Sequence, residues 1–149
     1  MSRRIRVRWP VLLGLPVLLA CAAERQPVEP PFVDLVQDGS VAVAVLVDTV
    51  SAGGVASVRF GNRSDQIYGF NPCERVVQRR VSSEWNTHRE PLRACNKMLY
   101  LLDAGQERIE RVDLPRDIAP GEYRLVFAFS ALSGSQGAVR AASGAFRVR

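Results

Sequence analysis

The sequence predicts an all-β fold, an antiparallel β-sandwich. Between residues 41 and 149, short runs of β-branched and aromatic residues are separated by Gly, Pro, Asn, Asp and Ser at fairly regular spacing. Some runs alternate in character, with Val58 and Phe60 set against Ser57 and Arg59, which is the period of a strand with one buried face. Helical periodicity is weak throughout. Together these observations favour two packed sheets over a helical architecture.

The expected strands follow one another with turn signals between them. Gly53-Gly54 ends the first run, and Gly105 separates two later ones. The last two strands are expected to pair as a terminal hairpin across a Gly/Ser-rich loop at residues 133–144. The strands are expected at residues 41–49, 55–62, 66–70, 74–81, 95–102, 106–114, 123–129 and 145–148.

The first twenty residues are typical of a secretory signal. Four arginines precede an apolar run at residues 11–20, which Gly14 and Pro16 interrupt. A membrane-spanning helix needs about 20 predominantly apolar residues, and this run is about half that length. We therefore expect residues 1–20 to be removed as a signal peptide.

The end of this run, Leu18-Leu19-Ala20-Cys21, resembles the processing site of bacterial lipoproteins. In that family the cysteine is diacylated on sulfur, becomes the new N-terminus and is usually acylated again on its amine. The resemblance implies lipidation of Cys21 with palmitate-type chains and stable anchoring, because two or more acyl chains hold a protein on a bilayer. Leu19 departs from the smaller residue that is more common in the family.

The expected location is the cell envelope, with the protein on the outer membrane and facing the periplasm or the cell exterior. In enterobacterial lipoproteins, a second mature residue other than Asp is associated with export to the outer membrane, and here that residue is Ala22. Ordinary secretion stays open as an alternative, because Ala20-Cys21-Ala22 also satisfies the small-x-small rule for cleavage before Ala23.

The mature chain is expected to hold one domain behind a tether. Residues 22–32 combine three prolines with several charges, a composition that stays extended and solvated. The expected organisation is a signal peptide at residues 1–20, the lipidated cysteine and a Pro-rich tether at residues 21–40, and a β-sandwich domain at residues 41–149.

The net charge of +5 comes mostly from the signal. Without its four arginines, 16 basic residues stand against 15 acidic ones. Steering of nucleic acid needs basic residues clustered on one face. Nucleic acid is therefore not an expected partner.

Lipidation of Cys21 leaves Cys73 and Cys95 as a pair in an exported, oxidising compartment, where a disulfide is expected. A bond across this loop stabilises the fold by roughly 3 kcal/mol in the loop-closure model. A metal site would need further ligands at finger or ribbon spacing, and the single histidine, His88, is not in such a pattern. No metal or other cofactor is expected.

Several motifs in residues 41–149 together resemble the immunoglobulin-like domains of exported bacterial proteins. They are Val58-Arg59-Phe60-Gly61-Asn62-Arg63-Ser64, Tyr68-Gly69, Trp85 after a tight turn, Leu102-Asp103-Ala104-Gly105-Gln106 and Pro120-Gly121-Glu122-Tyr123-Arg124-Leu125. The resemblance implies an immunoglobulin-like sandwich of about seven strands, with the hydroxyl of Tyr123 bonded to the backbone upstream as a tyrosine corner. It supplies no catalytic residue, because many unrelated functions use this sandwich. The cysteine spacing departs from the antibody pattern, so the disulfide is expected to staple the region around Trp85.

Other polar and aromatic residues are interpreted as structural. Trp85 is expected in the core or covering an edge, with a binding aromatic as the alternative. The arginines at positions 75, 79 and 80 are expected on a solvated strand face, with a grip for phosphate or carboxylate as the alternative. Asn62-Arg63-Ser64 matches a glycosylation sequon and is interpreted as turn chemistry.

No enzyme activity is expected. His88 could act as a general base for Ser82 or Ser83, but a triad is recognised by geometry and nothing in the sequence marks either serine as activated. Glu74 and Glu84 are too far apart and too loosely placed to be interpreted as an acid/base pair.

The expected function is that of a lipid-anchored envelope protein with a non-catalytic binding or structural domain. Its expected partners are the membrane and an envelope protein, and residues 87–94 and 133–144 are the candidate surfaces. The alternative is a secreted proteinase inhibitor, because the Asn-x-Ser turn, the tryptophan after a hairpin and the Pro-Gly-x-Tyr step also resemble a small bacterial inhibitor family. The constrained stretch between Cys73 and Cys95 would then be the inhibitory loop.

Overall fold

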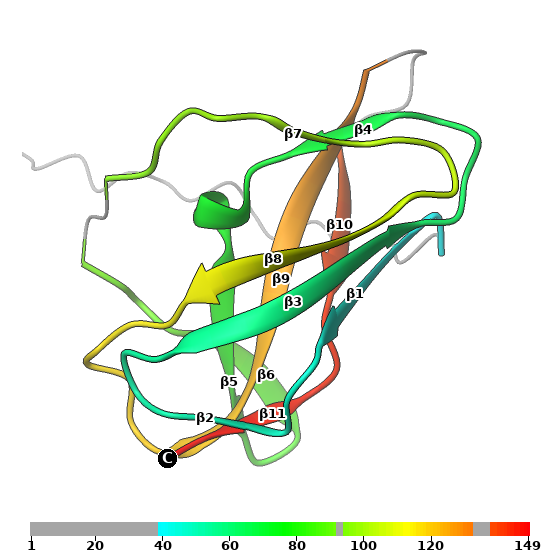
Figure 1. The fold of residues 1–149 in the computed structure, drawn as a ribbon. Helices are drawn as coiled ribbons and strands as arrows, with labels where there is room; N and C mark the ends of the chain where they lie inside the picture. Colours follow the sequence, from blue (N-terminus) through cyan, green and yellow to red (C-terminus); the bar gives the residue numbers. More distant parts are fainter. Residues whose placement is uncertain (1–38, 92–93, 133–137) are drawn as a thin grey trace, which may run out of the picture. The chain divides into compact units, whose positions relative to one another are not determined.

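The computed structural model describes residues 39–91, 94–132 and 138–149. All of them belong to the second of the two units into which the chain divides, Phe32–Arg149. They form eleven β-strands and one short 3-10 helix, so the predicted all-β class is confirmed. Two sheets pack face to face around the hydrophobic core (Figure 1). The described residues contain no helix that could serve as a membrane span.

The smaller sheet has three antiparallel strands in the order β1-β3-β8. Ala56, Val58 and Phe60 of the central strand are fully buried, and the side chains between them point away from the core. One face of this sheet therefore packs on the core and the other faces solvent. Its strands are β1 Val41–Val45, β3 Val55–Asn62 and β8 Glu107–Asp113.

The larger sheet is organised around β9, its longest strand, which covers Gly121–Ala131. β10 and β11 pair with one edge of β9, and β4 and β5 pair with the other. β2, β6 and β7 extend the sheet beyond β11, β5 and β4, respectively. These strands are β2 Thr49–Val50, β4 Tyr68–Phe70, β5 Val76–Val81, β6 Glu84–Thr87, β7 Tyr100–Leu102, β10 Val139–Ala142 and β11 Phe146–Val148, and the 3-10 helix η1 covers Pro72–Glu74.

Phenylalanines from both sheets meet at the centre of the core. The ring centroid of Phe60 lies 4.6 Å from that of Phe70 and 4.9 Å from that of Phe127, the second pair in an edge-to-face arrangement. Phe129 packs against Phe70 at 5.2 Å. Burying a side chain of this size stabilises a fold by about 1.5–3 kcal/mol, and aromatic pairing adds about 0.5–1.5 kcal/mol. Phe60 therefore makes β3 a main contact of the smaller sheet with the larger one.

The eleven described strands outnumber the approximately seven of the expected sandwich, because β6 and β10 were not expected and one expected strand is split in two. The predicted strand at 41–49 is divided, because the chain leaves the smaller sheet after Val45 and joins the larger sheet at β2. β2 then runs parallel to β11, whereas the other pairs among the described strands are antiparallel. The terminal pairing is confirmed, with Phe146 of β11 opposite Tyr123 of β9.

Two expected segments are wrong in part. The predicted strand at 95–102 pairs only over Tyr100–Leu102, because a disulfide and a hydrogen bond from Asn71 hold the residues before it. The predicted loop at 133–144 contains β10, whose Val139 and Ala141 pack on the core. Residues 133–137 lie outside the described residues.

Candidate functional site

The predicted disulfide between Cys73 and Cys95 is confirmed, with 5.6 Å between the two Cα atoms. It fastens the segment after β6 to η1, immediately before β5 begins. A hydrogen bond supports it, in which the side-chain amide of Asn71 donates to the backbone oxygen of Asn96 at 2.7 Å. The bond thus fixes one end of the region that follows Trp85. Leu92 and Arg93, inside that region, lie outside the described residues.

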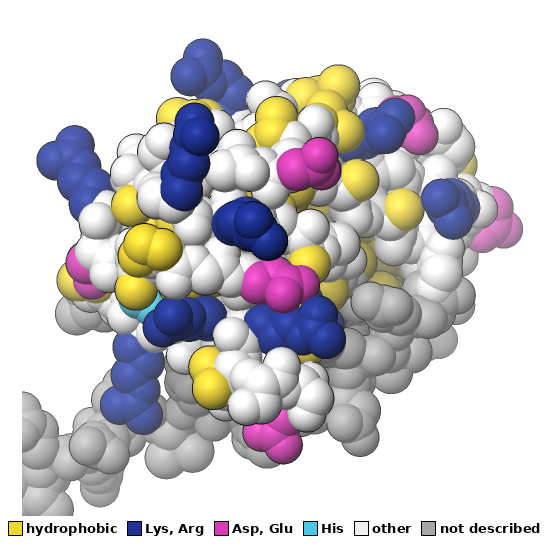
Figure 2. Space-filling view, turned by 90° about the horizontal axis from the view of Figure 1, so that it is seen from below, with side chains coloured by type: hydrophobic (Ala, Val, Ile, Leu, Met, Phe, Trp, Pro, Cys, Tyr) yellow, Lys and Arg dark blue, Asp and Glu magenta, His cyan; other side chains and the backbone are white. Residues whose placement is uncertain are grey.

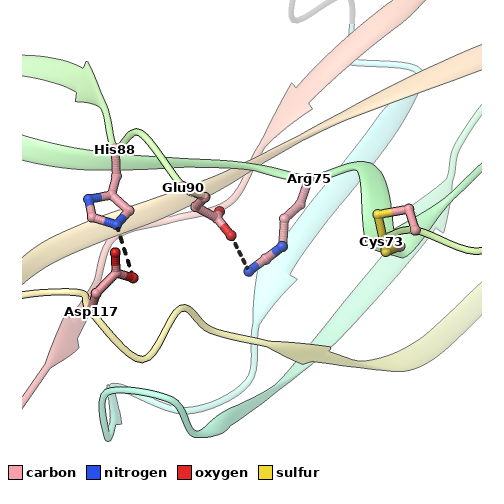
Figure 3. Close-up of polar contacts among 6 residues, drawn as sticks. Cys73, Arg75, His88, Glu90 and Asp117 are labelled. Atoms are coloured by element: carbon pink, nitrogen blue, oxygen red, sulfur yellow. Dashed lines mark hydrogen bonds and ion pairs between the residues drawn. A yellow bond between two sulfur atoms is a disulfide. The ribbon is translucent and has the colours of Figure 1, made fainter. Parts of the chain in front are cut away.

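Arg75 is part of this fastening and is buried. Its side chain is 1% exposed, and its Nη2 atom lies 3.2 Å from Oε2 of Glu90 (Figure 3). Removing one partner of a buried ion pair leaves an uncompensated charge and costs about 3–5 kcal/mol. The expectation that Arg75 lies on a solvated face is therefore wrong, because Glu90 compensates its charge inside the protein.

The other two arginines of the predicted strand face are separated from Arg75 and from each other. Arg79 and Arg80 are adjacent on β5, so their side chains point to opposite faces. Arg79 donates to the backbone oxygen of Pro120 at 3.2 Å, and Arg80 pairs with Glu122 at 3.1 Å. Both are exposed, as expected, but the structure does not assemble the three arginines into one grip.

The candidate catalytic residues are not brought together either. Nε2 of His88 lies 3.9 Å from Oδ1 of Asp117 (Figure 3). The backbone amide of His88 donates to the backbone oxygen of Val77 at 2.8 Å. Ser82 and Ser83 form the turn between β5 and β6, at the opposite end of β6. At about 3.3 Å per residue, Ser83 and His88 are separated by roughly 16 Å.

The full length of β5 separates the two glutamates. Glu74 ends η1 before β5 begins, and Glu84 starts β6 after the hairpin turn. The two carboxylates are therefore too far apart to act as an acid/base pair.

Trp85 lies on β6 at the outer face of the larger sheet. Its ring centroid is 4.7 Å from Cζ of Arg124 and 5.9 Å from Cζ of Arg80, which is its register partner on β5. The side chain is half-buried and takes no part in the hydrophobic core. Trp85 therefore covers the edge of the sheet beneath two guanidinium groups, which is one of the two structural roles expected for it.

Two further polar residues hold the guanidinium groups in place. Arg124 donates from Nε to Oε1 of Gln78 at 2.7 Å, and Arg80 pairs with Glu122. Burial lowers the pKa of the Arg124 guanidinium, which still stays charged at neutral pH. We call Gln78, Arg80, Trp85, Glu122 and Arg124 the arginine–tryptophan cluster. It presents one flat aromatic ring flanked by two positive charges and one negative charge.

A cavity of about 430 Å³ opens beside the disulfide. Its volume falls within the range of small-molecule sites, but most of its side chains are polar. It is lined by Asn71, Pro72, Cys73, Ala94, Asn96, Tyr100, Arg111, Val112 and Asp113. Among the described residues, no three His, Cys, Asp or Glu side chains converge as a metal site.

Two residues singled out by the sequence make local structural bonds. The hydroxyl of Tyr123 donates to the backbone oxygen of Ala119 at 2.7 Å, the hydrogen bond expected of a tyrosine corner. Asn62 is buried and donates from Nδ2 to the backbone oxygens of Leu102 and Asp103, both at 3.0 Å. The side-chain amide of the sequon asparagine is thus engaged in turn contacts.

The sequence reveals only part of the arginine–tryptophan cluster. A two-residue turn at Ser82-Ser83 places Arg80 opposite Trp85 across the hairpin. This pairing can be predicted from the sequence, because both residues lie close to the turn. Arg124 comes from β9, far along the chain, and only the assembled sheet brings it to Trp85. Cys21 lies outside the described residues. No protein-family model and no curated protein matches the chain.

Proposed function

We propose that the chain is a lipid-anchored protein of the bacterial cell envelope whose β-sandwich is a non-catalytic binding module. The motif Leu18-Leu19-Ala20-Cys21 supports the anchor. The disulfide adds support, because it uses Cys73 and Cys95 and leaves Cys21 as the remaining cysteine of the chain. Structural disulfides also belong to exported proteins.

The strand order supports the resemblance to immunoglobulin-like sandwiches. With the short strands β2, β6 and β7 set aside, and with β4/β5 and β10/β11 each counted as one strand, β1, β3 and β8 lie in the smaller sheet, and β4/β5, β9 and β10/β11 lie in the larger one. This distribution is that of the constant-type immunoglobulin domain without its fourth strand. Such sandwiches carry many functions, so the site must decide the function.

The observation that carries the binding proposal is the arginine–tryptophan cluster. Trp and Arg are the residue types most enriched at binding hot spots. Here two arginines and a tryptophan lie together on the outer face of a sheet whose opposite face builds the core. The module therefore presents a preformed surface, which reduces the side-chain ordering that binding requires.

Two experiments test the two parts of this proposal. Producing cells grown with an azide-bearing palmitate should label the wild-type chain and not the Cys21→Ser variant. Crosslinking in intact cells should yield a partner that is lost with Trp85→Ala and retained with Ile109→Ala, a matched change at a residue that is 60% exposed on the other sheet. Equal capture by both variants would contradict the assignment of this surface.

The inhibitor alternative rests on the stretch between Cys73 and Cys95. The Arg75–Glu90 pair holds Glu90 and the disulfide holds Cys95, and such constraints lower the entropic cost of docking into a protease. Titration of the mature protein against a panel of envelope and secreted proteases tests it. Stoichiometric inhibition that disappears on reduction would favour this function over the binding module.

A further inference from the structure

Four large apolar side chains lie exposed where β4, β7 and β9 meet. Among the described residues, ten large hydrophobic side chains are exposed, and these four form one group. They are Ile67, Leu99, Leu101 and Leu132, with exposed fractions of 40, 56, 46 and 51%. We call this group the apolar patch.

Strand register makes the patch continuous. Tyr68 and Phe70 of β4 point into the core, so Ile67 and Gly69 belong to the outer face. Leu101 pairs with Gly69 in register, and the backbone amide of Leu132 donates to the oxygen of Ile67 at 2.9 Å.

Leu99 closes the remaining gap in the patch. Its side-chain atoms lie 2.9 to 3.1 Å from the place that a Cβ on Gly69 would occupy. The side chain therefore lies over Gly69, whose register partner is Leu101.

The chain enters the sandwich at this same end. The backbone oxygen of Ser40 accepts from the amide of Arg63 at 2.7 Å, and the side chain of Ser40 contacts the hydroxyl of Tyr68 at 3.3 Å. β1 therefore begins beside the turn that leads into β4, whereas the C-terminus lies at the opposite end (Figure 1). We call the end with Ser40 the tether-side end.

The segment between Cys21 and Gly39 is short enough to keep this end near an anchoring membrane. Residues 22–38 would span between roughly 20 Å as a flexible coil and 50 Å as an extended polyproline helix. A tether of this length gives a second, weak contact an effective concentration on the order of millimolar. Even a weak affinity of the patch for lipid is then sufficient to hold it there.

We propose that the apolar patch rests on the phospholipid surface that holds the acyl chains of Cys21. This inference depends on the proposed lipid anchor. The apolar patch and the arginine–tryptophan cluster share the outer face of the larger sheet: Arg124 lies seven residues before Ala131 on β9, so the cluster lies roughly 23 Å along this face from the patch. A second copy of the chain is a weaker occupant, because β7 offers only Tyr100–Leu102 for strand pairing.

The test uses the acylated mature chain, extracted from the membrane fraction and reconstituted in phosphatidylethanolamine/phosphatidylglycerol vesicles with and without brominated acyl chains. A Leu132→Trp reporter is placed in a Trp85→Phe background, since Trp9 leaves with the signal. The matched control is Leu46→Trp in the same background. Leu46 is 40% exposed and follows β1 at the end opposite Ser40.

Bromolipids should quench the Leu132→Trp reporter severalfold more than the Leu46→Trp control. Equal quenching of the two overturns the proposal. Protection of Leu132→Trp from aqueous iodide without bromolipid quenching also overturns it, and would assign the patch to a protein partner such as a second copy. If Leu132→Trp does not fold, Leu101→Trp serves as the reporter.

The palmitate label separates this inference from the function on which it depends. A chain without the label overturns the lipid anchor and the inference together. A labelled chain whose reporters are quenched equally overturns the inference alone.

Discussion

Asn62 shows how one side chain can organise one end of a sandwich. From the end of β3 it donates to backbone oxygens of Gln66, Leu102 and Asp103, and its Oδ1 accepts from the amide and hydroxyl of Ser64. The amide group thus joins the turn after β3 to the turn before β8. An amide offers both donors and an acceptor from one short side chain, and no other residue of that length does so.

Replacement of Asn62 by Ala should therefore destabilise the protein by about 3 kcal/mol, because buried carbonyl oxygens lose their donors. The free energy of unfolding in urea measures this change. The control is Arg63→Ala, a neighbouring exposed position that should change stability by less than about 0.5 kcal/mol. Similar values for the two variants would mean that the Asn62 contacts are not formed.

The protonation state of Tyr123 makes the stability of the fold depend on pH in the alkaline range. Burial raises the pKa of its hydroxyl above the ordinary value of 10.0, and nearby Arg79 acts in the opposite sense. The folded state thus holds this proton more tightly than the unfolded chain. The corresponding stability is complete below pH 10 and is lost as the pH rises through the raised pKa.

The Tyr123→Phe variant should lose about 1 kcal/mol at neutral pH, because the hydrogen bond to Ala119 is absent. Above pH 10.0 its stability should fall less steeply than that of the wild type. Urea midpoints measured from neutral to alkaline pH test both statements. Parallel curves for the two proteins would exclude Tyr123 as a source of the alkaline loss.

At the scale of elements, the segment between β6 and β7 joins two strands of the larger sheet, and its Ala94 and Asn96 line the same cavity as Arg111 and Asp113 of β8. It contains no regular structure over most of its described length, so its position depends on Cys95, on Glu90 and on the bond that Asn71 makes to Asn96. Few backbone hydrogen bonds hold such a segment. The disulfide, the ion pair and the side-chain hydrogen bond take the place of the backbone hydrogen bonds that would hold a strand.

The Cys73→Ser/Cys95→Ser double variant should lose about 3 kcal/mol, as expected for a loop that spans 22 positions. Chemical unfolding of the oxidised protein and of the double variant gives this difference. The wild-type protein unfolded with a reductant present should match the double variant. A change below about 1 kcal/mol would indicate that the ion pair and hydrogen bond hold the segment without the disulfide.

The contact of Leu99 with Gly69 predicts a compensating pair of substitutions. Gly69→Val should destabilise the protein by less than about 1 kcal/mol, because the atoms it meets are the end of the Leu99 side chain, which is 56% exposed and can turn aside. Leu99→Ala in the same chain should recover most of this loss, since it removes the obstructing atoms. Additive effects in a double-mutant cycle would contradict the packing described here.

Local signals explain which elements are predictable from the sequence. β3 has the predicted bounds of residues 55–62, because its alternation and flanking glycines lie within one stretch. β10 was missed because Gly, Ser and Ala surround it and give no strong alternation, and its place is set by β9. The shortening of β7 and the burial of Arg75 depend on partners at Cys73 and Glu90, which periodicity does not reveal.

At the scale of the whole domain, its two ends differ in surface chemistry. The tether-side end carries the apolar patch beside the entry of the chain. Seen from below, where the C-terminus lies, the domain shows lysine or arginine side chains next to acidic ones, with apolar groups between them (Figure 2), and the exposed Leu46 and Val47 follow β1 at the end opposite Ser40. This mixed surface suits contact with water. The apolar patch beside the entry of the chain agrees with the proposal that the tether-side end rests on a membrane.

The proposed function depends most on how the N-terminus is processed. The intact mass of protein extracted from the membrane fraction, measured without and with a reductant, tests the anchor and the disulfide in one experiment. The predicted mass is that of a chain beginning at Cys21 with its acyl chains, which gains two hydrogens when Cys73–Cys95 is reduced. An unmodified chain beginning at Ala23 would contradict the lipid anchor and favour a secreted domain.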